Sequence, residues 1–135
     1  MTDWSRYFAI GSALNNIVTL YDLGIVEPYQ DPYDRFPIEV EAADALTYGH
    51  GLARTAWRWG FIYKTQRDIL KTYCAGKSAI AYTRLRDEDW DWMYCQVVMT
   101  WPKETPPIRA MAADYIIPEF ILGIKVLQNY GASLP

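Results

Sequence analysis

The strongest constraint on the fold is a row of large aromatic residues at every second position between Arg54 and Tyr63. The row consists of Trp57, Trp59, Phe61 and Tyr63. Successive side chains point to opposite faces of a β-strand, so this spacing predicts a strand with the aromatics on one face. Such a wide aromatic face is typical of the inner wall of a sheet, and we expect it in the core. A platform that stacks on sugar rings is the alternative interpretation.

Three other segments show the same alternation and predict further strands. Apolar residues alternate with glutamates over residues 38–42, and with smaller residues over 78–85, while 92–101 forms the return strand. Residues 86–91 then link the last two strands as an acidic hairpin tip. Asp44 to Gly51 supply turn residues after the first of these strands.

The last element covers Tyr115 to Gln128. Pro118 and Gly123 would disrupt a helix interior, so we expect a long strand with a bulge or edge at Pro118. A helix is the alternative. The strand would place on one side Phe120, Leu122, Ile124 and Val126.

One short helix is predicted directly after the aromatic row. Thr65 and Asp68 have capping-box spacing, and Gly76 provides a stop about three turns later. The apolar stripe of this helix consists of Ile69, Leu70, Tyr73 and Cys74. A single short helix is not stable alone, so it must lie against the sheet.

The length and composition predict one folded domain over residues 1–135. Hydrophobic residues make up 51% of the chain and charged residues 21%, close to the average of globular proteins. The strand spacing predicts a mainly β (α+β) fold, a β-sandwich or half-barrel of about six strands, with the helix between the third and fourth. Residues 4–26 fit helical and extended patterns equally, and their structure stays open.

A proline- and tyrosine-rich segment runs from Glu27 to Pro37. Its prolines Pro28, Pro32 and Pro37 exclude regular structure, which predicts a loop or arm. The tyrosines in this segment give it apolar surface. We expect it to dock on its own domain, with docking on a neighbouring subunit as the alternative.

No residue pattern predicts catalysis. The sequence contains no nucleophile elbow, glycine-rich phosphate loop or paired-carboxylate motif, so we expect no enzyme activity and no cofactor. His50 is the single histidine, and its place between two glycines predicts an exposed turn residue rather than a zinc ligand. Cys74 and Cys95 lack metal-binding spacing, and we expect two reduced core residues.

The acidic tip raises a calcium hypothesis. Asp87, Asp89 and Asp91 have the spacing that opens a calcium-binding loop. The glycine required at the sixth position is Trp92, and the carboxylate required at the twelfth is Val98. The tip is therefore predicted to be a solvated turn, and no metal site is expected.

Several groups of packing residues carry a resemblance to a known family. They are Trp57-Arg58-Trp59-Gly60-Phe61, Gln66, Asp68, Leu70, Cys74, Ala81-Tyr82-Thr83-Arg84 and Val98-Met99-Thr100-Trp101-Pro102. This pattern resembles a small virion protein of the tail modules of tailed bacteriophages. The family often has Leu-Thr leading into its helix, with the threonine as the cap, whereas this chain has Ile62-Tyr63. If Thr65 takes over the cap, the helix begins about two residues later.

The resemblance implies a β-sandwich with a helix on its flank, stacked as rings around a channel. Tail-tube, terminator, distal-tail and baseplate-hub proteins share that fold. It implies contacts with copies of itself and with neighbouring tail proteins, in a virion assembled in the host bacterial cytoplasm. The net charge of −3 is compatible with a lumen through which DNA passes without binding.

Two further features bear on partners. The chain contains six Trp, eleven Tyr and four Phe, more apolar surface than a small core hides, which favours subunit contacts. No apolar run approaches the ~20 residues that span a bilayer, and no membrane contact is expected. The competing hypothesis is a carbohydrate-binding module that stacks sugars on Trp90, Trp92 or Trp101.

Overall fold

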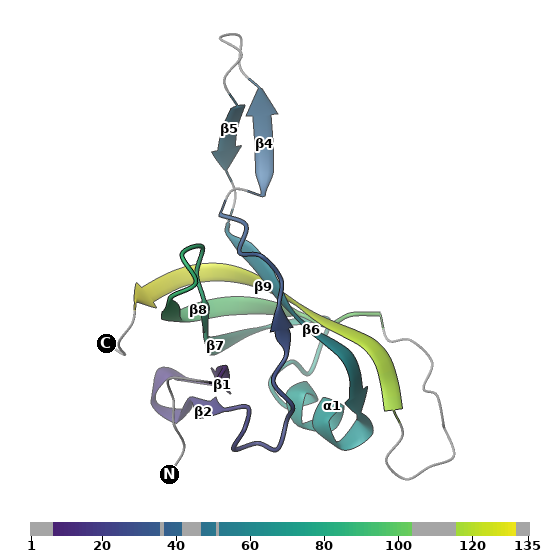
Figure 1. Ribbon diagram of the computed structural model, residues 1–135. Coiled ribbons are helices and arrows are strands. Elements are labelled where there is room, and N and C mark those ends of the chain that lie inside the picture. The colour runs from purple at the N-terminus through teal and green to yellow at the C-terminus, as the bar shows by residue number, and fades with distance from the viewer. Residues whose placement is uncertain (1–6, 36, 42–46, 51, 104–115, 132–135) are drawn as a thin grey trace.

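The computed structural model describes residues 7–35, 37–41, 47–50, 52–103 and 116–131. Seven strands form one antiparallel sheet that curls into a half-barrel, in the order β2-β1-β7-β8-β9-β6-β3 (Figure 1). The strands are β1 (Ala9–Gly11), β2 (Val18–Thr19), β3 (Tyr29–Gln30), β6 (Arg54–Tyr63), β7 (Ser78–Arg86), β8 (Trp92–Thr100) and β9 (Ile116–Gly131). The predicted mainly β half-barrel with one flanking helix is confirmed.

The core lies on one face of the curled sheet. Alternate residues of the long strands are buried there, namely Trp57, Trp59, Ala81, Thr83, Leu85, Met93, Cys95, Val97, Met99, Phe120, Leu122, Ile124 and Val126. Leu20 and Ile25 of the N-terminal segment and Leu70 of the helix belong to the same cluster. Burying each large aliphatic side chain stabilises the fold by roughly 1.5–3 kcal/mol. The predicted strands over 78–85, 92–101 and 115–128 therefore form, and the predicted face of the last one points inward. Over 78–85 the buried face is that of the smaller residues Ala81 and Thr83, whereas Ile80 is exposed.

The N-terminal residues, whose structure the sequence left open, contribute short extended pieces. Strands β1 and β2 flank a 3₁₀ turn, η2 (Leu14–Asn16). Gly11 ends β1 and lies against Ile17 on the far side of this turn, where an added Cβ would meet the Ile17 Cα at 2.8 Å. Only glycine fits such a close approach. Because these short strands precede the long ones, the helix follows β6 rather than the third strand, which corrects the predicted position.

The aromatic row on β6 is only half buried. Trp57 and Trp59 are 0% and 3% exposed, but Phe61 and Tyr63 are 54% and 38% exposed, so the prediction that these two lie in the core is wrong. Trp59 pairs with Phe120 and Phe61 with Pro118, so Gly60 lies opposite Glu119 of β9. Glu119 has a left-handed φ of 52°, which bends the strand there. This kink shifts the buried face by one residue, so that Ile62 is buried in place of Phe61.

Helix α1 (Lys64–Lys71) begins earlier than predicted and is shorter. The Tyr63 N–H donates to the Gln66 side-chain oxygen at 3.3 Å, the back-bond of a capping box. Thr65 therefore lies inside the helix, and its predicted role as the cap is wrong. The helix ends in the αR-conformation cap Thr72, whose hydroxyl donates to the Ile69 carbonyl at 2.6 Å.

A second, two-stranded sheet stands away from the half-barrel (Figure 1). It consists of β4 (Ile38–Glu41), where a strand is predicted, and β5 (Thr47–His50), where turn residues are predicted. The register places Val40 opposite Tyr48. Four successive pairs join the two strands, so residues 47–50 lie in a strand despite the turn propensity of Gly49. His50 is thus paired in a strand, opposite Ile38, and not in a turn.

Candidate interaction surfaces

The segment from Gly24 to Asp34, here called the strap, crosses the body and is anchored to it. The Trp59 indole N–H donates to the Val26 carbonyl at 2.7 Å, and the Gln66 amide donates to the Gly24 carbonyl at 3.1 Å. Most of the proline- and tyrosine-rich segment therefore docks on its own domain. Tyr29 and Gln30 pair with β6 as β3, so the predicted exclusion of regular structure is wrong for these two residues.

The second half of the strap is held by charge and by main-chain pairing. The Arg58 guanidinium donates to both carboxylate oxygens of Asp31 at 3.0 Å. The Asp31 N–H donates to the Ala56 carbonyl at 2.9 Å, and Asp34 forms a main-chain bridge with Arg54. These contacts keep the strap along the outer side of β6.

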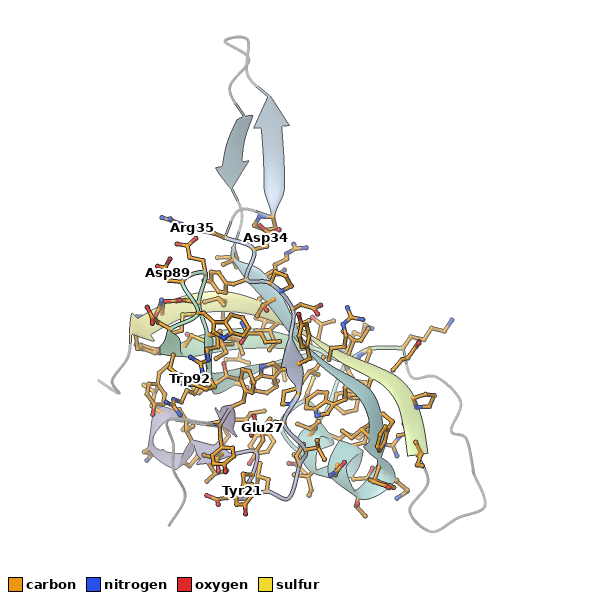
Figure 2. All side chains as sticks on the ribbon, viewed as in Figure 1. Tyr21, Glu27, Asp34, Arg35, Asp89 and Trp92 are labelled. Carbon is orange, nitrogen blue, oxygen red and sulfur yellow. The ribbon has the colours of Figure 1, made fainter. Side chains whose placement is uncertain are left out.

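Glu27 of the strap reaches toward the N-terminal segment (Figure 2). Its Oε2 accepts the Phe8 N–H at 3.2 Å, while its Oε1 is buried and has no hydrogen-bond partner among the described residues. Burial raises the pKa of this carboxyl to about 7, and the bond from the Phe8 N–H opposes the rise. Glu27 thus ties the strap to the start of β1 with a carboxyl that titrates near neutrality.

An apolar edge patch lies where the strap leaves β6. Its members are Val26 (59% exposed), Tyr29 (68%), Phe61 (54%) and Tyr63 (38%). Phe61 and Tyr63 pack edge to face at 5.9 Å, and a shallow hollow of about 270 Å³ lies between Val26, Tyr29 and Phe61. Strand β3 pairs only with Trp57 and Arg58 of β6. From Trp59 to Tyr63, no described strand pairs with the edge of β6 that faces away from β9. The patch therefore adjoins an uncovered strand edge, a feature that invites pairing with another chain.

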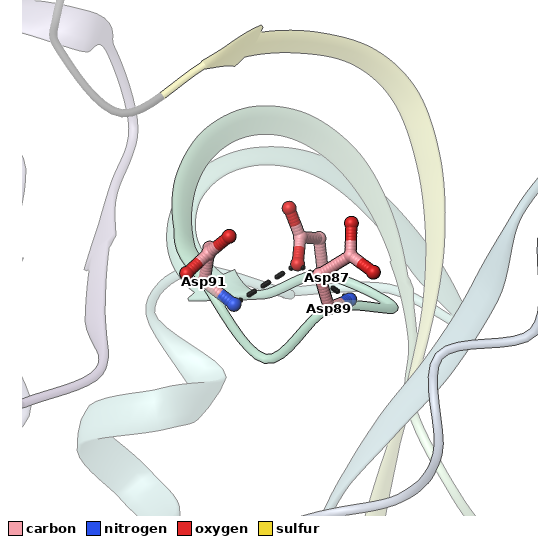
Figure 3. A group of neighbouring side chains, drawn as sticks. All are labelled: Asp87, Asp89 and Asp91. Carbon is pink, nitrogen blue, oxygen red and sulfur yellow. Dashed lines mark hydrogen bonds between the residues drawn. The ribbon is translucent and has the colours of Figure 1, made fainter.

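The tip of the β7–β8 hairpin brings Asp87, Asp89 and Asp91 together (Figure 3). One ligand oxygen from each lies within 4.8 Å of the others. One oxygen of Asp87 already accepts the N–H groups of Asp89 and Asp91, at 2.9 and 3.0 Å. The cluster is accounted for as the turn that closes the hairpin.

The tryptophans of this hairpin differ in exposure. Trp92 is half-buried, with the guanidinium groups of Arg84 and Arg86 at 4.4 and 3.9 Å from its ring. Trp90 is 53% exposed and has a left-handed φ of 64°, which is uncommon for a bulky residue. Trp90 is therefore the more solvent-exposed of the two tryptophans at the tip.

Trp90 borders a hollow between the tip and the strap. The hollow has a volume of about 220 Å³, and Tyr29 and Tyr33 line its other walls together with Asp87 and Glu88. Arg35 lies close by, with its guanidinium 3.3 Å from the Glu88 carboxylate. Figure 2 places Arg35 and Asp89 at this same end of the body. No local sequence pattern signals this hollow, because its two sides lie far apart in the chain.

The two cysteines are packed into the core. Cys74 and Cys95 are free and buried, as predicted. Burial raises the pKa of both thiols, that of Cys95 to about 12. His50 lies in β5, and its side chain falls outside the described part of the structure.

Comparisons with protein-family models, with curated proteins and with solved structures found no match to this chain. Among the described residues, no helix has the length and apolar character needed to cross a membrane.

Proposed function

We propose that this chain is a non-catalytic structural subunit that assembles into a ring in a bacteriophage tail, at the tail tube, the distal tail or the baseplate hub. Its partners are copies of itself and neighbouring tail proteins. The subunit would assemble in the host bacterial cytoplasm and remain in the virion, with DNA passing through the lumen of the ring.

The observation that carries this proposal is the hairpin β4–β5, which forms a sheet of its own (Figure 1). An isolated two-stranded hairpin is marginally stable in water, and a third strand or a packed layer stabilises it. The register pairs Ile38 with His50, Glu39 with Gly49, Val40 with Tyr48 and Glu41 with Thr47, and no other described strand pairs with either. A neighbouring copy is the source of the missing layer.

The apolar edge patch supports the same proposal. Single exposed apolar side chains are common, but Val26, Tyr29, Phe61 and Tyr63 gather beside one uncovered strand edge. The hairpin and the patch are different surfaces, so a contact between them is head-to-tail. Such a contact closes into a ring when the rotation between subunits permits it. The strap is anchored to its own domain, so the projecting hairpin β4–β5 is the segment that can reach a neighbouring subunit.

Light scattering after size exclusion, together with negative-stain microscopy, tests this proposal. The wild-type protein should form rings or higher oligomers. Replacing residues 38–50 with a short glycine-serine linker should give a folded monomer, and Phe61→Ser should weaken assembly. Ile80→Ser is the matched control, because Ile80 is 57% exposed but lies outside the patch. A strict monomer at high concentration, or rings that survive loss of the hairpin, would contradict the proposal.

A carbohydrate-binding module is the second candidate, favoured by the exposed ring of Trp90. Trp92 and Trp101, the other two tryptophans proposed to stack on sugars, are less accessible to a sugar ring. Trp92 lies against Arg84 and Arg86, and the half-buried Trp101 packs on Phe120 at 5.2 Å. A monomer whose binding on a glycan array is abolished by Trp90→Ala would favour this candidate over the ring.

A further inference from the structure

The hollow between the strap and the hairpin tip has three aromatic walls. Trp90 and Tyr29 are 53% and 68% exposed, and Tyr33 is half-buried between the strap and the tip. At about 220 Å³ the hollow is smaller than the 300–1,000 Å³ pockets that hold drug-sized ligands. Its size therefore fits a small ligand or the end of one side chain.

The charge of the hollow narrows the class of ligand. Asp87 and Glu88 line it, and the other carboxylates of the tip, Asp89 and Asp91, lie next to Asp87. Burial raises the pKa of the Tyr33 hydroxyl, and the negative charges of Glu88 and Asp87 add to the rise. Arg35, whose guanidinium lies 3.3 Å from the Glu88 carboxylate, opposes this rise and offsets one of the negative charges. The three aspartates of the tip leave an excess of negative charge at the hollow, and this charge attracts a cation.

The ring of Trp90 already takes part in an interaction of this kind. The Arg86 guanidinium lies 5.8 Å from the ring centroid and donates to the Trp90 carbonyl at 2.8 Å. An aromatic face attracts ammonium and guanidinium groups, and aromatic walls combined with carboxylates form the usual cage for them. A neutral sugar would gain stacking on the rings but would not offset the negative charge.

We propose that this hollow binds an organic cation, an ammonium or guanidinium group, between Trp90, Tyr29 and Tyr33 with Asp87 and Glu88 as counter-charges. The cation is either a free small molecule or the end of a basic side chain. The site does not depend on ring assembly, because its walls all come from one chain.

NMR titration of the ¹⁵N-labelled full chain tests the site with choline and with Nα-acetyl-arginine amide. Both should cause saturable shifts of the Trp90 indole signal, which is assigned by its loss in Trp90→Phe. The neutral carbon analogue of choline, 3,3-dimethyl-1-butanol, should bind about ten-fold more weakly, since it lacks the charge. Choline binding tighter than the arginine amide identifies a free cation, and the reverse identifies a side chain.

Variants separate the site from general charge effects. Trp90→Ala and Glu88→Gln should each weaken binding about ten-fold, as loss of a cation–π contact or a counter-charge does. Asp22→Asn makes the same change in net charge on an exposed residue, next to Tyr21 at the other end of the body, and should leave binding unchanged (Figure 2). The proposal is overturned if neither cation saturates, if the neutral analogue binds equally well, or if a neutral monosaccharide binds instead.

Discussion

The side-chain amide of Gln30 forms two hydrogen bonds with the main chain of Arg86. Its nitrogen donates to the Arg86 carbonyl at 2.7 Å, and its oxygen accepts the Arg86 N–H at 2.9 Å. Gln30 lies in β3, the strand at one end of the sheet. Arg86 is the last residue of β7, and it has no partner in β1, because β1 pairs only with residues 82–84. The amide thus takes the place of a strand partner and joins two distant parts of the curled sheet.

Gln30→Ala should lower the free energy of unfolding by about 1–3 kcal/mol, because it leaves the main-chain groups of Arg86 without their partner. Gln30 is 2% exposed, so water cannot readily replace the amide. Urea denaturation measures the change. Gln96→Ala is the control, since the Gln96 amide makes one 3.3 Å bond to the Tyr82 hydroxyl and should cost less. Equal effects of the two variants would show that the Gln30 bonds do not hold the sheet together.

Trp59→Ala should lower the free energy of unfolding by about 3–5 kcal/mol, the usual cost of truncating a buried large aromatic. Trp59 is 3% exposed, and its indole also anchors the strap at Val26. Phe61→Ala, two positions along the same strand, should cost less than about 1 kcal/mol because half of its ring is already in water. Chemical denaturation of both variants checks this difference, and similar losses would place Phe61 in the core.

Glu27→Gln should remove a pH dependence of stability between 4.5 and about 7, the ordinary and the folded pKa of this carboxyl. In that window the folded protein holds a proton that the unfolded chain has released, so the wild-type contribution is full below 4.5 and is lost as the pH rises. Unfolding curves across this range, compared between wild type and variant, isolate the effect. A difference that stays constant with pH would contradict the raised pKa.

Trp90→Asn should raise the free energy of unfolding by up to about 1 kcal/mol, because asparagine tolerates the left-handed conformation that strains tryptophan. Thermal unfolding followed by circular dichroism measures it. Trp90→Ala removes the same ring but keeps a residue unsuited to the φ of 64°, and should give no gain. An equal gain from alanine would assign the effect to loss of the ring rather than to the backbone.

Cys74 and Cys95 should not react with a thiol reagent at neutral pH while the protein is folded. Both are buried, and burial keeps the Cys95 thiol protonated, with a pKa of about 12. Labelling with iodoacetamide, followed by mass spectrometry, should modify both cysteines only in denaturant. Fast labelling of Cys95 in the folded protein would mean that β7 and β8 separate readily.

Local sequence pattern predicted the long strands and the buried face of β9. Alternation over residues 78–85 and 92–101, and over the first half of β6, is a property of neighbouring residues, and the structure follows it. The two cysteines were also predictable as core residues. Local pattern failed at Phe61, because the buried face shifts where Gly60 of β6 meets Glu119 of β9, and that pairing joins residues far apart in the sequence.

Which distant segments meet depends on the folded structure as a whole. Gln30 and Arg86 are 56 positions apart, and the hollow bordered by Tyr29 and Trp90 forms because the strap lies against the hairpin tip. The strap docks on its own domain as expected, but the side chains of β6 and α1 that hold it could not be identified from the sequence. Alternation fixes a strand locally, whereas closure of the half-barrel and the exposure of each aromatic depend on contacts that form only when the sheet curls.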